Sequence, residues 1–307
     1  MNKIICIVGP TGVGKTALSL ALAKQFNTEI INGDAFQVYQ EMNILNAKPT
    51  KEERRIVKHH LVDYLKISDS LDIASFKEEA TKIINSLFKD NKIPIIVGGS
   101  GLYLKSLLYD YQLNDLKGRN KDKLKKYDNY TNEEIFKLLE EVDLDASKKL
   151  HPNNRKRVLR ALEIFDENNI KKSDFINKQN HQPLYDILFI GLTMERELLY
   201  QCINNRVDKM VNNGLIDEVT TLYHKYNNCN YQALQAIGYK EFIPYFNNEI
   251  NLEDAIDKVK QNSRRYAKKQ YTWFNNQMEV KWINVDINDF KKCINEAISL
   301  VRGFINE

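Results

Sequence analysis

A glycine-rich loop near the N-terminus limits the possible folds of this chain more than any other segment. Residues 9–16 fit the pattern G-x-x-x-x-G-K-[ST], and they follow an apolar run of strand length at residues 4–8. After the loop, Leu18, Leu22 and Phe26 recur at helical spacing. A strand, such a loop and a helix form a P-loop, in which backbone N–H groups and the helix N-terminus surround phosphate oxygens. We therefore expect a polyphosphate ligand.

The loop and the next strand supply the first candidate site residues. The loop consists of Gly9, Pro10, Thr11, Gly12, Val13, Gly14, Lys15 and Thr16. Lys15 is expected to reach the terminal phosphate, and the Thr16 hydroxyl to coordinate Mg²⁺. Asp34 follows a strand candidate at residues 29–32, and neighbouring parallel strands end at the same sheet edge. A carboxylate there can accept a proton from an acceptor group; the alternative is that Asp34 only caps a turn.

Strand and helix patterns alternate over the first third of the chain. Strand-like runs and helical spacings occupy residues 29–32, 60–65 (the weakest), 73–88, 93–97 and 102–109. Strands that alternate with helices of this length indicate βαβ units. The sequence therefore predicts an α/β fold, a P-loop parallel sheet flanked by helices.

The pattern changes in the middle of the chain, where the sequence becomes polar, lysine-rich and helical in spacing. Strand character returns at residues 186–192 and again at 279–285. We predict that residues 1–110 and 186–307 form one α/β core with C-terminal helices. Residues 111–185 are then a helical insertion domain within that core.

The charges are concentrated in two tracts. Lys and Arg number 45 against 41 Asp and Glu, a net charge of +4, yet residues 148–160 and 258–271 are rich in cations and contain no acidic residue. Such tracts are typical of surfaces that bind the phosphate backbone of nucleic acid. The alternative, two solvated helix faces, stays open from charge alone.

Composition and the terminal sequence limit where the protein acts. The chain is 43% apolar and 28% charged, which suits a folded domain. No stretch approaches about 18 consecutive apolar residues, so no membrane-spanning helix is expected. The N-terminus lacks the apolar segment of a secretory signal, which predicts a cytoplasmic location. Without a heptad pattern, we expect a monomer with no obligate protein partner.

Several segments, taken in order, resemble the bacterial tRNA dimethylallyltransferase (tRNA isopentenyltransferase) family. They are GPTGVGKT at 9–16, GDAFQVY at 33–39, AKP at 47–49, VGGSGLY at 97–103, HPNNRKRVLRALE at 151–163, RVDKM at 206–210, GLIDEV at 214–219, AIGYKE at 236–241 and AKKQYTWF at 267–274. The matches span nearly the whole chain. Together they are far more specific than the P-loop alone.

The resemblance implies transfer of a dimethylallyl group from dimethylallyl diphosphate to tRNA. The acceptor would be the exocyclic amine of the adenine 3′-adjacent to the anticodon, in tRNAs reading codons that begin with U. The loop amides, Lys15 and Mg²⁺ would stabilise the departing diphosphate. Asp34 would accept the amine proton, and Arg206 would add a second cation. Ser100 stands where the family usually has threonine and would position the same centre.

The resemblance also implies a set of tRNA-binding residues. The set is Asp34, Ala35, Phe36, Gln37, Ser100, Lys156, Arg157, Val158, Leu159 and Arg160. An adenine stacked in an anticodon loop must be extruded before an enzyme can modify it. The helical insertion at 111–185 would clamp the tRNA anticodon stem-loop. The cations and aromatics of residues 264–269 would suit phosphate binding and base stacking, although Tyr266, Tyr271, Trp273 and Phe274 equally suit the core side of a long helix.

Two segments depart from the family pattern. Ala35-Phe36 replaces a usual Ser-Arg, and residues 43–46 replace an Asp-Ile-Gly-Thr pattern. These changes affect contacts with the target adenine more than binding of the diphosphate.

Two other functions are alternatives. A P-loop small-molecule or nucleoside kinase would share the loop, Asp34 and the core, but this function does not account well for the C-terminal third and the basic tract at 148–160. An RNA-binding protein without catalysis is the other alternative.

Overall fold

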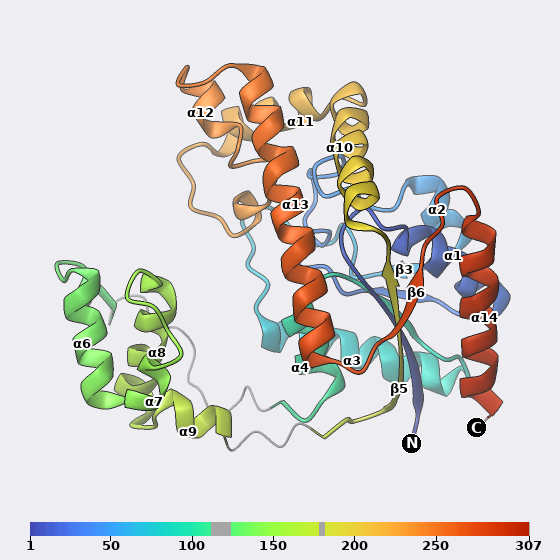
Figure 1. The fold of residues 1–307 in the computed structure, drawn as a ribbon, viewed down its shortest axis with the longest axis horizontal. Coiled ribbons are helices and arrows are strands. Elements are labelled where there is room, and N and C mark those ends of the chain that lie inside the picture. Colours follow the sequence, from blue (N-terminus) through green and yellow to red (C-terminus); the bar gives the residue numbers. More distant parts are fainter. Residues whose placement is uncertain (112–123, 178–181, 307) are drawn as a thin grey trace. The chain divides into compact units, whose positions relative to one another are not determined.

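The computed structural model describes residues 1–111, 124–177 and 182–306 (Figure 1). Contacts divide the chain into two compact units, a core unit of Met1–Leu108 with Pro183–Glu307 and a helical unit of Tyr109–Gln182. Each unit has its own cluster of buried apolar side chains. The predicted insertion at 111–185 overlaps the helical unit, and its action as a clamp remains a prediction.

The core unit is built on one parallel sheet of six strands in the order β3-β2-β4-β1-β5-β6. The strands are β1 (Lys3–Val8), β2 (Ile30–Asn32), β3 (His59–His60), β4 (Ile95–Val97), β5 (Asp186–Thr193) and β6 (Lys281–Asn284). Consecutive strands require crossovers, which helices supply. The predicted α/β fold with a parallel sheet flanked by helices is confirmed.

The central strand explains why the sheet forms from this sequence. Residues 4–8 of β1 are fully buried, and β1 pairs with β4 on one side and β5 on the other. Both faces of such a strand are covered, so its residues form a continuous apolar run rather than an alternating one. Burial also raises the pKa of the Cys6 thiol in the middle of this strand.

Helices cover the sheet and extend beyond its edge. In the core unit they are α1 (Lys15–Gln25), α2 (Lys51–Ile56), α3 (Ile73–Lys89), α4 (Gly101–Leu108), α10 (Arg196–Asn212), α11 (Leu215–Tyr226), α12 (Ile243–Phe246), α13 (Leu252–Gln277) and α14 (Phe290–Asn306). Helix α1 packs against α14, and α10 packs against the long helix α13 (Figure 1). Within the described ranges, no helix is long and apolar enough to cross a membrane.

One predicted strand is much shorter than expected. The pattern at 60–65 predicted a strand there, whereas β3 is confined to His59–His60, with one further bridge at Leu65. The cause is local, since Leu61 and Asp63 adopt left-handed backbone angles, with φ of 57° and 62°, that end the extended run. The Asn32 amide at the end of β2 donates to the Leu61 carbonyl (2.9 Å) and holds this turn against the sheet.

The helical unit contains four described α-helices around a small core. They are α6 (Asn132–Val142), α7 (Leu144–Ser147), α8 (Arg155–Asn168) and α9 (Lys172–Asn177), preceded by a 3-10 turn at Lys125–Tyr127. A capping box between Thr131 and Glu134 starts α6. Ile135 and Leu139 of α6 pack with Val158 of α8 in the unit's apolar core.

The helical unit also contains a buried charge pair that gives Arg160 a structural role. Arg160 Nη1 donates to Glu163 Oε2 at 2.6 Å on α8, and the Glu163 side chain is only 2% exposed. A carboxylate in such a place needs a cation or donor, because burial removes its hydration. Arg160, predicted to bind tRNA, thus already neutralises a buried acid.

We predict that Arg160→Ala lowers the free energy of unfolding by about 1–3 kcal/mol, because it leaves the Glu163 carboxylate buried without its donor. Urea unfolding of the full chain at neutral pH measures the change. Arg157→Ala removes an exposed arginine from the same helix and is the matched control, with a change within about 0.5 kcal/mol. Equal losses in the two variants would contradict the structural role of Arg160.

Candidate active site

The P-loop joins the end of β1 to the start of α1, as the motif predicted. Gly12 and Gly14 have φ of 84° and 105°, a region that side chains other than glycine rarely adopt. Gly14 occupies the N-cap position of α1, so the free N–H groups of the first turn remain available to a ligand. The loop therefore presents backbone donors and a helix N-terminus to one small volume.

Two partly buried cations lie at this loop. Lys15 Nζ donates to the carbonyls of Gly9 (2.9 Å) and Pro10 (2.8 Å), and Arg206 Nη1 on α10 donates to the Thr11 hydroxyl (2.9 Å). Burial lowers the pKa of Lys15 to about 8, and the positive charge of Arg206 contributes. Burial also lowers the pKa of Arg206. Two desolvated cations this close favour an anionic ligand, because it would restore the charge balance.

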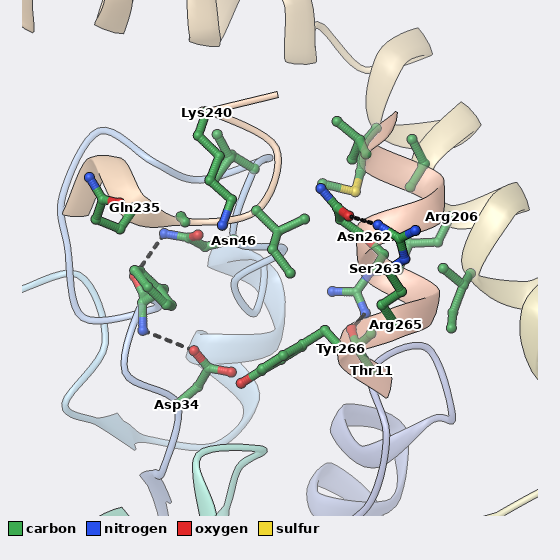
Figure 2. A pocket seen from close by; sticks show the side chains of 18 of the residues that line it. Thr11, Asp34, Asn46, Arg206, Gln235, Lys240, Asn262, Ser263, Arg265 and Tyr266 are labelled. Carbon is green, nitrogen blue, oxygen red and sulfur yellow. Dashed lines mark hydrogen bonds between the residues drawn. The ribbon is translucent and has the colours of Figure 1, made fainter. Parts of the chain in front are cut away.

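Asp34 lies just beyond the end of β2 and faces these cations. Its backbone N–H donates to Asn32 Oδ1 (3.0 Å), and its Oδ1 accepts from the Phe36 N–H (2.9 Å). Asp34 therefore does cap a turn, yet its carboxylate also points into a cavity (Figure 2). Its negative charge raises the pKa values of both Lys15 and Arg206, against the effect of burial.

Ser100 holds the Asp34 turn in place from the neighbouring strand. Its Oγ accepts from the Ala35 N–H at 3.0 Å, and its backbone N–H donates to the Gly33 carbonyl at 3.3 Å. The two turns approach so closely that a Cβ on Gly98 would lie 2.2 Å from the Gly33 oxygen. Only glycine fits there, so the VGGSG segment serves to bring the ends of β2 and β4 together.

Helix α13 reaches the same site through Gln270, whose role the sequence did not reveal. The Thr11 N–H donates to Gln270 Oε1 at 2.8 Å, and Gln270 Nε2 donates to the Gly99 carbonyl at 3.2 Å. The residue is 4% exposed. Gln270 lies within the AKKQYTWF segment, but its bonds join residues 171 and 259 positions away, which no local pattern reports.

Two cavities meet at this site. The first, about 460 Å³, is lined partly by Gly12, Lys15, Thr16, Gln37, Gly98 and Gln270 and is called the P-loop cavity below. The second, about 470 Å³, is lined partly by Phe36, Leu45, Ile203, Met210, Ile237 and Val259 and is called the α13 cavity (Figure 2). The residues common to both linings are Thr11, Asp34, Asn46, Arg206 and Tyr266.

The segment that departs from the family pattern forms one wall of the α13 cavity. The Glu218 carboxylate on α11 accepts the backbone N–H groups of residues 43, 44 and 45 at 2.9–3.0 Å. Asn46 Nδ2 donates to the Phe36 carbonyl at 2.7 Å, and Gln37 Nε2 donates to the Asn46 carbonyl at 3.3 Å. The substituted residues thus hold the Asp34 turn and residues 43–46 together.

The other predicted tRNA-binding residues lie in the helical unit. Lys156 and Arg157 are exposed on α8, Leu159 is partly buried and Val158 is fully buried. A fully buried valine packs the core, so among these four residues the exposed side chains are the two cations. Ala35 is half-buried beside Asp34 in the core unit.

The second basic tract belongs to α13 and serves more than one purpose. Arg265 and Lys269 are exposed and line the α13 cavity, whereas Lys260 pairs with Asp208 at 2.6 Å. Tyr266 lines both cavities, and Phe274 is fully buried. One face of this helix is therefore core and the other bounds the site.

These features define a P-loop protein with a cationic pocket beside a carboxylate, at the C-terminal edge of a parallel sheet. Nucleotide kinases share that description, because they too bind an acceptor beside such a carboxylate. The long basic helix α13, which bounds the second cavity, is the feature that a small-molecule kinase does not need.

Comparison with known proteins identifies the family. The model of the IPP transferase family matches residues 37–277. A tRNA dimethylallyltransferase of Anoxybacillus flavithermus is 43% identical over 304 residues, 98% of this chain and 97% of that one. The crystal structure of a tRNA isopentenylpyrophosphate transferase from Staphylococcus epidermidis is 41% identical, with a TM-score of 0.73 over 99% of each chain. The chain belongs to the IPP transferase family, as its motifs predicted.

A more distant structure shares the fold as well. It is a eukaryotic dimethylallyltransferase described as acting on tRNA, 31% identical with a TM-score of 0.89, and the match covers 100% of this chain and 80% of that one. The kinase alternative is not favoured, because the relatives that match nearly the full chain are prenyl-group transferases.

We predict that Gln270→Glu raises the KM for a diphosphate substrate about tenfold. A glutamate can still accept from the Thr11 N–H, but it cannot donate to the Gly99 carbonyl, and it adds a negative charge beside the phosphate loop. Steady-state kinetics with varied diphosphate substrate measures this. Gln277→Glu makes the same charge change at an exposed position of α13 and should leave the KM unchanged. Equal KM values for the two variants would contradict the prediction.

Proposed function

We propose that this protein transfers the dimethylallyl group of dimethylallyl diphosphate to the exocyclic amine of the adenine 3′-adjacent to the anticodon in tRNA. The observation that carries the proposal is the meeting of a cationic P-loop cavity and a second cavity at Asp34. The relatives that match nearly the whole chain are named for this transfer to tRNA. The tRNAs concerned would be those reading codons that begin with U. Because the substrate is tRNA, we also propose a cytoplasmic location.

In this proposal the P-loop cavity holds the donor's diphosphate. Breaking the allylic C–O bond leaves both bonding electrons on the diphosphate, so its charge grows as the bond lengthens. The loop N–H groups, Lys15 and Arg206 are fixed in place before that charge develops, which is the arrangement that lowers the barrier. The loop thus binds a leaving group instead of a nucleoside triphosphate.

A divalent metal ion generally assists such a departure, and we assign Mg²⁺. Mg²⁺ takes one or two protein oxygens together with phosphate oxygens and water. The Thr16 hydroxyl, which lines the P-loop cavity at the start of α1, fits that requirement. When bound there, the ion would neutralise part of the diphosphate charge.

Asp34 acts on the acceptor amine as its proton acceptor. The exocyclic nitrogen forms a bond to the allylic carbon while it loses one proton, and the Asp34 carboxylate accepts that proton. The α13 cavity is wide enough and apolar enough for an extruded adenine, with Phe36, Leu45 and Ile237 among its walls. The base would therefore reach Asp34 from the side opposite the diphosphate.

Exposed cations of the helical unit extend the contact to the rest of the tRNA. Lys156 and Arg157 present two positive charges on one side of α8, where phosphates of an anticodon stem-loop can bind. This supports the proposal that the helical unit clamps the stem-loop. Arg265 and Lys269 at the mouth of the α13 cavity supply further positive charge.

The proposal is tested by mass spectrometry of nucleosides after unmodified tRNA is incubated with the protein, Mg²⁺ and dimethylallyl diphosphate. The tRNA carries adenines on the 3′ side of its anticodon. We expect a new isopentenyl-adenosine. Its absence, together with ATP-dependent phosphorylation of a small acceptor, would establish a kinase instead, and its absence with tight tRNA binding would mean an RNA-binding protein without catalysis.

We predict that Asp34→Asn lowers turnover at least about 100-fold, because the amide cannot accept the amine proton. Binding of the diphosphate should change less than about twofold, since the asparagine side chain keeps an oxygen that can accept from the Phe36 N–H. Single-turnover rates and direct titration of the donor separate the two effects. Asp90→Asn, exposed at the end of α3, is the control. A parallel loss of binding and turnover would overturn the role of Asp34.

We predict that Arg157→Ala weakens tRNA binding a few-fold and reduces the slope of log Kd against log salt by about 0.7–0.9, the loss of one phosphate contact. Filter binding at several salt concentrations gives the slope. Lys24→Ala removes an exposed lysine from α1 and should leave the slope unchanged. An unchanged slope in Arg157→Ala would count against the proposed contact on α8.

A further inference from the structure

The residues shared by both cavities mark where donor and acceptor meet. The shared set is Thr11, Asp34, Asn46, Arg206 and Tyr266. Thr11 and Arg206 belong to the diphosphate site, Asp34 is the proposed proton acceptor, and the Asn46 amide is engaged by the Phe36 carbonyl. Tyr266 is the shared residue whose role nothing above explains.

We propose that Tyr266 is a positioning residue, whose hydroxyl orients the Asp34 carboxylate at the junction of the two cavities. The proposal rests on the proposed function and names a group that the reaction needs besides the proton acceptor itself. Its basis is the placement of the side chain. Figure 2 shows Tyr266 extending from α13 across the cavity, with its hydroxyl end toward Asp34.

The Asp34 carboxylate requires such a partner because its own turn fixes only one of its oxygens. Oδ1 accepts from the Phe36 N–H, which leaves rotation of the carboxylate to be limited by groups across the cavity. A phenol O–H directed at a carboxylate forms a strong hydrogen bond, since the acceptor is charged. That bond would hold the second oxygen in line for the incoming amine.

The protonation state of Tyr266 suits a donor. Burial raises the pKa of Tyr266 well above its usual range, and the negative charge of Asp34 raises it further, against smaller effects of hydrogen bonds with Ser100 and Gln270. The hydroxyl therefore keeps its proton at neutral pH. The Asp34 charge likewise raises the pKa values of Lys15 and Arg206.

The helix that carries Tyr266 is fixed next to the site by the residues that follow the tyrosine. Gln270 lies four residues later on the same face of α13, and it bonds to the P-loop at Thr11 and to the Gly99 carbonyl. Trp273, three residues further on, packs against Gly101, where a Cβ would lie 2.1 Å from the indole ring. The tyrosine is thus held on a rigid element whose register is set by the phosphate loop itself, as precise positioning requires.

The first test is Tyr266→Phe, which keeps the ring that lines the cavities and removes only the hydroxyl. We expect kcat for dimethylallyl transfer to fall about 10- to 100-fold, the effect of one hydrogen bond to a charged group. The KM for dimethylallyl diphosphate and the Kd for tRNA should change less than about twofold, because neither substrate loses a contact.

The matched control is Tyr185→Phe. Tyr185 is a partly buried tyrosine that packs on Phe88 outside both cavities. A purely structural Tyr266 would lower the thermal stability and leave kcat of the folded protein unchanged, and that result would overturn the proposal.

The second test asks whether Tyr266 acts through Asp34. Single-turnover rates are compared for wild type, Tyr266→Phe, Asp34→Asn and the double variant. If the hydroxyl only orients the carboxylate, Tyr266→Phe causes no further loss once Asp34 is replaced. The same fold loss in both backgrounds would show an independent action and overturn the proposal.

The same series separates this proposal from the proposed function. If the wild-type protein forms no isopentenyl-adenosine, the proposed function fails and with it the basis of the Tyr266 assignment. If the wild type forms product and Tyr266→Phe forms it at the same rate, the function stands and only the Tyr266 assignment fails.

Discussion

Two partly buried cations meet at one phosphate loop, and the other parts of the site are arranged around them. Lys15 and Arg206 come from different helices, and both lose hydration where the loop closes on them. Without an anion, the loop carbonyls, the Thr11 hydroxyl and Asp34 are what offset their charge. In the proposed function, these cations attract the diphosphate and stabilise the further charge that develops when the C–O bond breaks.

Helix α13 connects this cationic loop to the carboxylate that the second substrate would approach. Gln270 fixes the helix to the phosphate loop and to the turn after β4, and Ser100 on that turn fixes the backbone beside Asp34. The phosphate loop and the carboxylate are therefore parts of one hydrogen-bonded assembly, and both border the two cavities. Chemical steps that need both substrates at defined positions gain from such a fixed geometry.

The residues that depart from the family pattern near Asp34 are held by hydrogen bonds of their own. Asn46 and Phe36 stand where other members usually have threonine and arginine, yet Asn46 bonds to the Phe36 carbonyl and so ties their two loops together. Glu218 supplies three further acceptor contacts to residues 43–45. The wall of the α13 cavity is thus more apolar at Phe36 and Leu45 than the family pattern, and these hydrogen bonds hold it in place.

The parallel sheet, the P-loop and the family could be predicted from the sequence, because they depend on local periodicity, on glycines at fixed offsets and on motifs in a fixed order. It also picked out Asp34, Ser100 and Arg206, but not how they meet. The folded chain was needed to show that Glu163 beside Arg160 is buried, that β3 stops at His60, and that Gln270 and Tyr266 reach the phosphate loop and Asp34. The burial of Glu163 depends on how the helices of its unit pack, and the short β3 depends on left-handed turns at Leu61 and Asp63. The bonds of Gln270 join residues up to 259 positions apart, which hydrophobic spacing and local motifs do not encode.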